Sequence, residues 1–517
     1  MSITLQNNDK SSNKRIMFMV MLCGNSFKKI HPNPGLRYYS KATNEKFYGR
    51  QRLPIYTGQA IHETRPYLLN PGELTPGITA VEYYQRRLKM SSKLQSDSCL
   101  IIAGKDIQFA SGAVFYPFQQ DNDLFYLTGW NEPNSVMVIQ KHSENDDDIT
   151  FTMFVQEKNA FAEQWEGYRT GIEGVQEIFN ADQAFGINQL RNKLPDMLKQ
   201  SEVIFFNDNL KDPLNKNRTD IIRLINEGGL LRTKNYKRIV ADIRKVKSDA
   251  ELKIMRRAGQ ISGKSYNQAF AKRFRNERTL ASYLDHKFIS GGCDKSAYIP
   301  VVATGSNALC IHYTRNNDVM FDDEMVLVDA SGSLGGYCSD ISRTWPVSGK
   351  FTTAQRDLYQ SVLNVQKQCI ELCKETNHLS LEDIHQESLK YMKQELKNLG
   401  IGNVKNWDVE RLYPHYIGHN LGLDVHDVPE ASRYEKLQDG QAITIEPGLY
   451  IPDSEEFPKY FRNVGIRIED DIAIGKDTYA NLTVEALKEI SDLERVMNDG
   501  KVLDKFEEDV ICPLSDG

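Results

Sequence analysis

The sequence lacks the marks of several large classes of protein. None of its eight cysteines belongs to a C-x-x-C pair, which argues against a thiolate zinc site or a disulfide framework. The net charge of −6 at pH 7 gives no sign of a nucleic-acid partner. With 40% hydrophobic and 26% charged residues, the composition is typical of a soluble globular protein. A chain of 517 residues leaves room for two or three domains.

The first 44 residues are short of acidic side chains. They contain seven lysines and arginines but a single acid, Asp9. Their apolar run, IMFMVMLCG at 16–24, is nine residues long and too short to cross a bilayer, so we expect no transmembrane segment. This composition predicts a mitochondrial presequence with its linker over 1–60. A basic tail without a targeting role stays open, and a secretory signal is less favoured because Lys28 and Lys29 follow the apolar run.

The pattern of apolar runs changes near residue 240. Before that point a helical pattern over 76–94 is followed by strand-like runs, which predicts an α/β N-terminal domain over 61–240. These runs cover 99–104, 135–140 and 149–156. After that point, three helix starts are predicted by N-cap residues followed by an acid or amide three positions later. They are Ser248 to Glu251, Thr352 to Gln355, and Ser380 to Asp383. We expect a second domain over 241–500 and an acidic tail over 501–517.

Five residues of metal-binding type follow one another in the second domain. They are Asp329, Asp340, His419, Glu446 and Glu469. Four of them end or lie in strand-like runs, over 325–329, 337–342, 442–446 and 464–469. Four carboxylates and one imidazole make an oxygen-rich set of ligands. Such a set favours Mn²⁺-type ions, in contrast to the thiolate ligands of many zinc sites.

Two of these carboxylates are predicted to face each other. Gly332, Gly335 and Gly336 indicate a turn between two strand-like runs. If that turn centres on Leu334-Gly335, Asp329 and Asp340 are cross-strand partners, with Cβ atoms about 4.5–5.5 Å apart. Like charges at that distance repel, so the pair makes sense with cations between the two carboxylates.

Five segments in this half of the chain resemble the aminopeptidase P family. They are YIPVVATGSNALCIHY (298–313), VDASGSLGGYCSDISRTWP (328–346), HYIGHNLGLDVHD (415–427), IEPGLY (445–450) and GIRIEDD (465–471). The resemblance extends over roughly 64–495. It implies an α+β chain, with a catalytic domain of the "pita-bread" metallopeptidase fold behind an aminopeptidase P N-terminal domain.

The resemblance also implies a role for each site residue. Two divalent cations, with Mn²⁺ expected, would be bridged by Asp340 and Glu469. Asp329 would bind one ion, while His419 and Glu446 would complete the other. Glu446 would also act as the general base. His312, His415 and His426 match positions that contact the substrate and stabilise the tetrahedral intermediate. Arg467 lies two positions before Glu469, where a guanidinium can orient carboxylates.

The function that follows is a dinuclear-metal aminopeptidase acting on polypeptide N-termini. Within the family, the leader and the segments over 62–87 and 120–137 look most like members that remove one residue from mitochondrial proteins after presequence cleavage. We then expect a place in the matrix or at the inner membrane. An X-Pro aminopeptidase, a prolidase and a non-catalytic binding protein of the same fold are successively less favoured. The oligomeric state stays open, with a homodimer as one candidate.

Overall fold

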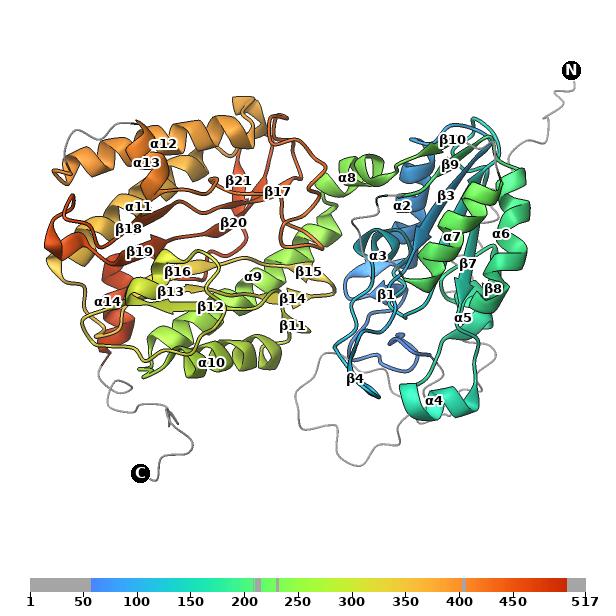
Figure 1. Cartoon of the computed structure of the whole chain (residues 1–517), viewed down its shortest axis with the longest axis horizontal. Helices are drawn as coiled ribbons and strands as arrows, with labels where there is room; N and C mark the ends of the chain where they lie inside the picture. Colours follow the sequence, from blue (N-terminus) through green and yellow to red (C-terminus); the bar gives the residue numbers. More distant parts are fainter. Residues whose placement is uncertain (1–56, 208, 210–214, 229–231, 402–405, 500–517) are drawn as a thin grey trace, which may run out of the picture. The chain divides into compact units, whose positions relative to one another are not determined.

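A computed structural model describes residues 57–207, 209, 215–228, 232–401 and 406–499 (Figure 1). The predicted presequence, most of its linker and the predicted acidic tail lie outside the described residues. The described chain separates into two compact units between Ile243 and Arg244. No helix in the described part combines the length and apolar character needed to span a membrane.

The first unit is built on a six-stranded mixed sheet of order β10-β9-β3-β6-β7-β8. The strands are β3 (Ser98–Ala103), β6 (Val136–Lys141), β7 (Ile149–Val155), β8 (Gln183–Gly186), β9 (Val203–Phe205) and β10 (Arg232–Lys234). The three runs predicted as strands are confirmed as β3, β6 and β7. Two short hairpins stand apart from this sheet. They are β1 (Glu73–Thr75) with β2 (Ile78–Thr79), and β4 (Phe109–Ser111) with β5 (Val114–Phe115).

Helices cover both faces of this sheet (Figure 1). Apolar side chains of α6 (Leu190–Lys199) and α7 (Lys216–Glu227) form one core with β3, β6 and β9. On the opposite face lie α2 (Ala80–Ser91) and α3 (Asn122–Thr128). The remaining helices that begin in the described part of this unit are α4 (Ala160–Glu166), α5 (Gly171–Glu177), α8 (Lys237–Lys245) and the 3₁₀ turn η3 (Ile187–Gln189).

The second unit contains several small antiparallel sheets between helices. One sheet joins β12 (Val301–Thr304), β13 (Met325–Asp329) and β16 (Ser342–Pro346). A second joins β17 (Ala442–Ile445), β20 (Asp470–Ile474) and β21 (Tyr479–Asn481). A third joins β11 (Lys295–Ser296), β14 (Gly332–Leu334) and β15 (Tyr337–Cys338), and a two-stranded pair joins β18 (Gly448–Ile451) to β19 (Val464–Arg467).

The helices of this unit are α9 (Asp249–Phe270), α10 (Glu277–Ser290), α11 (Thr353–Glu371), α12 (Leu381–Asn398), α13 (Asn406–Leu412) and α14 (Ile490–Asn498). Short 3₁₀ turns are η4 (Gly305–Leu309), η5 (Glu375–Asn377) and η6 (Lys459–Phe461). Figure 1 shows α9 and α10 on one side of the sheets and α11 and α12 on the other. One apolar core joins these helices to the strands between them. The predicted capping boxes are confirmed at α9, α11 and α12.

The predicted hairpin register is wrong. The turn consists of Gly335 and Gly336, whose φ angles of 58° and 86° are the left-handed values that a two-residue hairpin turn favours. Leu334 pairs with Tyr337, and Asp329 therefore lies opposite Ser342. The hairpin also divides between two sheets. Asp340 consequently lies in the irregular break between β15 and β16.

Candidate metal centre

The five residues of metal-binding type converge at the ends of strands from different sheets. Asp329 is the last residue of β13, and Glu446 directly follows β17. Asp340 and Glu469 lie in the breaks before β16 and β20, where the backbone leaves the ladder. His419 comes from a non-helical segment, and its carbonyl oxygen accepts a hydrogen bond from the N–H of Thr444 in β17.

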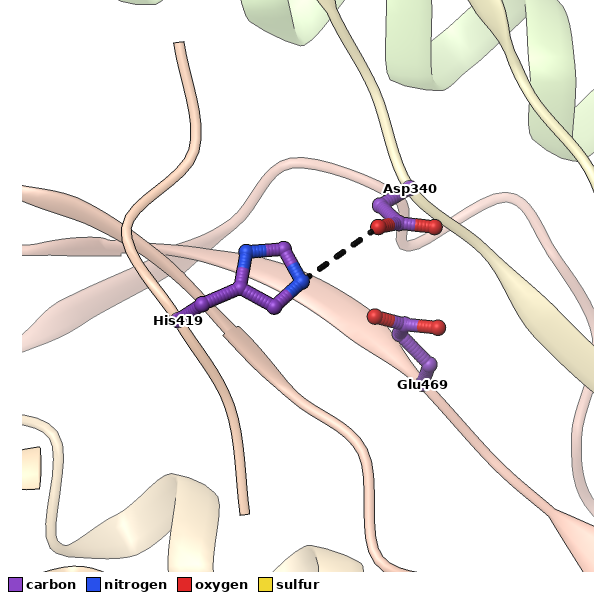
Figure 2. A group of neighbouring side chains, drawn as sticks. All are labelled: Asp340, His419 and Glu469. Atoms are coloured by element: carbon purple, nitrogen blue, oxygen red, sulfur yellow. Dashed lines mark ion pairs between the residues drawn. The ribbon is translucent and has the colours of Figure 1, made fainter. Parts of the chain in front are cut away.

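Three of these side chains point toward one another (Figure 2). One ligand atom each from Asp340, His419 and Glu469 lie within 4.8 Å of one another. The Nε2 atom of His419 is 3.6 Å from Oδ2 of Asp340 and 3.6 Å from Oε1 of Glu446. The Nδ1 atom of His419 is 3.0 Å from the carbonyl oxygen of Asn420 and donates to it. When the ring is neutral, the Nε2 lone pair therefore faces the carboxylates, as a metal ligand requires.

Asp329 joins this group through a tyrosine and an arginine. The Tyr298 hydroxyl lies 2.5 Å from Oδ1 of Asp329 and 2.5 Å from Oδ1 of Asp340. A hydroxyl has one proton, so at any moment it donates to one of these carboxylates. Arg467 is buried and donates from Nη2 to Oδ2 of Asp329 at 2.7 Å. It also donates to Ser342 Oγ at 2.9 Å, and Ser342 in turn donates to Oε2 of Glu469 at 2.7 Å.

The cluster holds more negative charge than the surrounding cations neutralise. Burial and the neighbouring carboxylates raise the pKa of Asp340 and raise that of Glu469 well above its ordinary value. Burial raises the pKa of Glu446 to about 7, against the attraction of His419 and Arg467. Burial alone would lower the pKa of His419, but the nearby carboxylates of Asp340 and Glu446 raise it to about 9.

One carboxylate oxygen is left over. Oε1 of Glu469 is buried and has no hydrogen-bond partner among the residues that the structure describes. A buried oxygen of a charged group is costly without a partner. A cation between Glu469, Asp340 and His419 would supply one, so these residues fit a divalent metal.

The three candidate substrate histidines differ in their surroundings. His312 and His426 are both exposed. The His426 ring lies 4.2 Å from the His419 ring, between centroids, and partial desolvation together with the positive charge of His419 lowers its pKa to about 4. His415 is held on both ring nitrogens. Its Nδ1 donates to the Tyr416 carbonyl at 2.9 Å, so its Nε2 accepts from the Tyr450 hydroxyl at 2.9 Å.

Tyr450 completes a chain of hydrogen bonds around the site. Arg467 Nη1 donates to the Tyr450 oxygen at 2.8 Å, and Tyr450 donates onward to His415. Burial and the positive charge of Arg467 lower the pKa of His415 to about 3. His415 is therefore neutral near pH 7 in this arrangement.

Sequence reasoning missed Tyr298 and Tyr450, and it missed Asp471. Asp471 is fully buried and accepts from Ser339 Oγ at 2.7 Å and from the Asp340 backbone N–H at 3.1 Å. It thereby fixes the irregular segment that presents Asp340. All three residues lie inside the quoted family segments, which was the available signal. Their types alone did not distinguish them from ordinary core residues.

Comparisons with known proteins agree with this geometry. Residues 253–476 match metallopeptidase family M24, and residues 83–205 match the aminopeptidase P N-terminal domain. The chain is 64% identical to intermediate cleaving peptidase 55 of Saccharomyces cerevisiae over 496 residues, which is 92% of this chain and 97% of that protein.

Two solved structures extend the comparison. The crystal structure of Saccharomyces cerevisiae Icp55 lacking 58 N-terminal residues has a TM-score of 0.79 and 66% identity, covering 83% of this chain and 100% of that one. Zinc-substituted Escherichia coli aminopeptidase P in complex with product has a TM-score of 0.77 and 29% identity, covering 81% of this chain and 98% of that one. The chain therefore belongs to metallopeptidase family M24, as a divalent-metal-dependent aminopeptidase that carries an aminopeptidase P N-terminal domain.

Proposed function

We propose that this enzyme removes a single N-terminal residue from mitochondrial proteins after their presequence has been cleaved, in the matrix or at the inner membrane. The observation that carries the substrate class is the 64% identity to yeast intermediate cleaving peptidase 55 along nearly the whole of both chains. The chemistry is supported by the converging side chains of Asp340, His419 and Glu469, and by the buried oxygen of Glu469 that has no hydrogen-bond partner within the described part of the chain.

Two divalent cations, Mn²⁺ by the oxygen-rich ligand set, would be held by Asp329, Asp340, His419, Glu446 and Glu469. When bound, such ions polarise a peptide carbonyl and lower the pKa of water. Asp340 and Glu469 suit a bridging role because each faces more than one other ligand. Arg467 and Tyr298 would keep Asp329 and Asp340 in place through the contacts described above.

The chain's own residues would then manage the protons. Glu446 turns Oε1 toward His419, which leaves Oε2 to take a proton from the attacking water. As the bond between the first carbonyl carbon and the leaving nitrogen breaks, Glu446 returns that proton to the leaving amine. His312 and His426 would donate hydrogen bonds to the carbonyl oxygen while it carries negative charge. His415 would contact the substrate by exchanging its Tyr450 partner for a substrate atom.

The decisive experiment is a comparison of mitochondrial N-termini with and without this chain. Without it, mature substrates should begin one residue earlier, with a bulky residue exposed. Wild type should restore the shorter N-termini, whereas His419→Ala should not. Identical N-termini in all three samples would contradict the proposal.

The leader of this chain supplies its own candidate substrate. Arg37-Tyr38-Tyr39-Ser40 has an arginine, one residue, and then an aromatic residue before serine. Cleavage after Tyr38 by the processing peptidase would expose Tyr39, which this enzyme would remove. Mass spectrometry should find Ser40 at the mature N-terminus in wild type and Tyr39 in the His419→Ala variant. Tyr39 in active wild-type cells would contradict self-trimming.

General X-Pro aminopeptidase activity is the second candidate, favoured by the likeness to Escherichia coli aminopeptidase P. Two peptides that begin Tyr-Ser and Tyr-Pro and are otherwise identical separate the two functions. We expect release of tyrosine from the Tyr-Ser peptide. Cleavage confined to the Tyr-Pro peptide would support the alternative.

A further inference from the structure

One buried carboxylate fastens the loop that carries His312. Glu277 is the first residue of α10, and its side chain is fully buried. Its Oε1 accepts from the Thr304 N–H at 2.9 Å, the Thr304 hydroxyl at 2.7 Å and the Asn307 amide at 3.1 Å. Its Oε2 accepts from the Tyr313 hydroxyl at 2.8 Å and the Asp318 N–H at 3.0 Å.

These donors span the whole loop. Thr304 ends β12 before the loop, Asn307 lies in η4, Tyr313 directly follows His312, and Asp318 lies near the other end. All five donating groups are neutral, so the carboxylate is stabilised by directed hydrogen bonds and by its position in the first turn of α10. Because both oxygens are used, moving any part of the loop would leave buried charge less well solvated.

Apolar packing also holds the loop near His312, because Ile311 and Tyr313 lie against a small buried cluster that includes Ala308 and Tyr450. His312, Thr314 and Arg315 are exposed. A second fastening lies four residues after His312, where Asn316 is buried with a φ of 47°. Its side chain accepts from the Val302 N–H at 2.8 Å and donates to the Pro300 carbonyl at 2.8 Å. Asn316 anchors the loop to the start of β12, whereas Glu277 fixes the segment that contains His312.

We propose that Glu277 is a positioning residue for catalysis, which holds His312 in place through Tyr313 without touching substrate. The inference rests on the proposed function insofar as His312 contacts the substrate. A displacement of a contacting group by about 1 Å can cost up to roughly a hundredfold in rate. Loosening this loop should therefore lower activity through the displacement of His312.

The test is a double-mutant cycle on the metal-loaded, full-length enzyme. Glu277→Gln should lower kcat/KM at least tenfold in the wild-type background and less than twofold in a His312→Ala background, since the residue through which it acts is already missing. Tyr313→Phe, which removes only the donor next to His312, should give the same pattern with a smaller loss. The proposal would be overturned if Glu277→Gln left kcat/KM unchanged. It would also be overturned if Glu277→Gln lowered kcat/KM by the same factor in the His312→Ala background as in wild type.

Glu251→Gln is the matched control. Glu251 is also a buried carboxylate at the start of a helix, where it accepts from the Ser248 N–H and from Tyr337 at 2.7 Å, away from the His312 loop. Any loss it causes should multiply with His312→Ala.

Trypsin cleavage after Arg315 reports on the loop without using activity. It should accelerate in Glu277→Gln and not in Glu251→Gln, and equal rates would contradict the fastening role. If His312→Ala is fully active, the proposed role of His312 fails, while the trypsin result still decides whether Glu277 fastens the loop.

Discussion

Two groups of buried carboxylates in the second unit differ in whether side-chain cations neutralise them. Asp427 is paired with Arg244 at 2.5 Å and with Lys247 at 3.0 Å. Asp470 is paired likewise, with Arg343 at 2.7 Å and Lys488 at 2.5 Å. Despite burial, which alone would raise them, these cations hold the pKa values of both carboxylates below the ordinary range.

The carboxylates of the candidate metal centre show the opposite behaviour. The pKa values of Asp340, Glu446 and Glu469 are raised, because burial and mutual repulsion outweigh the cations nearby. Asp470 is the residue directly after Glu469, so the contrast arises within one step of the chain. Proteins seldom bury unbalanced charge without a use for it. The fold pairs Asp427 and Asp470 with two side-chain cations each, whereas the candidate ligands Asp340, Glu446 and Glu469 keep raised pKa values that a bound cation would lower.

The largest expected effect separates the two groups directly. Asp340→Asn should abolish peptidase activity, roughly a thousandfold or more, because Asp340 would contribute to holding both ions. Its thermal unfolding should stay close to that of the metal-free wild type. A steady-state assay with circular dichroism measures both, and near-normal activity with full metal content would break the comparison.

Asp470→Asn should have the reverse outcome. Removing one partner of a buried ion pair leaves Arg343 and Lys488 uncompensated and typically costs about 3–5 kcal/mol. Urea unfolding should reveal this loss, while the folded fraction keeps its metal. Loss of metal binding without loss of stability would show that the paired group is not merely structural.

Removal of metal should have a pH-dependent effect on stability. In the metal-free protein Glu446 has a pKa of about 7, above its ordinary 4.5, and His419 has one of about 9, above its ordinary 6.5. Between pH 6.5 and 9 the folded state therefore binds more protons than the unfolded state, so the free energy of unfolding falls as pH rises. Below pH 6.5, His415 and His426 act in the opposite sense, because their pKa values are lowered to about 3 and about 4 in the folded state. Asp427 and Asp470 contribute stability that is lost only as pH falls below about 3.8.

Melting temperatures of chelated and Mn²⁺-loaded protein across this range measure the effect. Metal binding strengthens as its ligands lose protons, so the stabilisation by Mn²⁺ should grow with pH. EDTA should inactivate the enzyme, and Mn²⁺ or Co²⁺ should restore activity better than Mg²⁺. If the stabilisation by Mn²⁺ became smaller as pH rises, the assignment of Glu446 and His419 as metal ligands would be contradicted.

The smallest expected effect concerns Tyr298. Tyr298→Phe removes the hydroxyl between Asp329 and Asp340, which should cost about 1–3 kcal/mol in metal-free protein and less after metal is bound. The reason is that a cation takes over the neutralisation of these carboxylates. Urea unfolding with and without Mn²⁺ measures the difference, and an equal loss in both states would assign Tyr298 a purely structural role.

Local features of the fold could be predicted from the sequence because their causes are local. The three capping boxes and the strands β3, β6, β7 and β13 follow from neighbouring residues. The hairpin register failed for a physical reason. The glycine pair at 335–336 provides the two left-handed residues of the turn, and the ladder is interrupted around Asp340, which a regular two-residue alternation cannot reveal.

The candidate site shows the same limit. The candidate ligands could be named in advance from family segments, but the contacts that orient them join distant parts of the chain. Arg467 meets Asp329, and Asp471 meets Asp340, across more than 100 residues. Such pairs depend on how separate sheets are placed, which periodicity does not encode. His415 was expected to contact the substrate. The structure adds that its ring is held by the Tyr416 carbonyl and by the hydroxyl of Tyr450, a residue 35 positions further along the chain.

The most direct test of the central claim is the metal content of the folded protein. Wild type loaded with Mn²⁺ and freed of excess metal by gel filtration should retain two ions per chain by elemental analysis. Asp340→Asn should retain fewer than one, and Asp470→Asn should retain two in its folded fraction. Full turnover by exhaustively chelated wild type, or two ions bound to Asp340→Asn, would contradict the account.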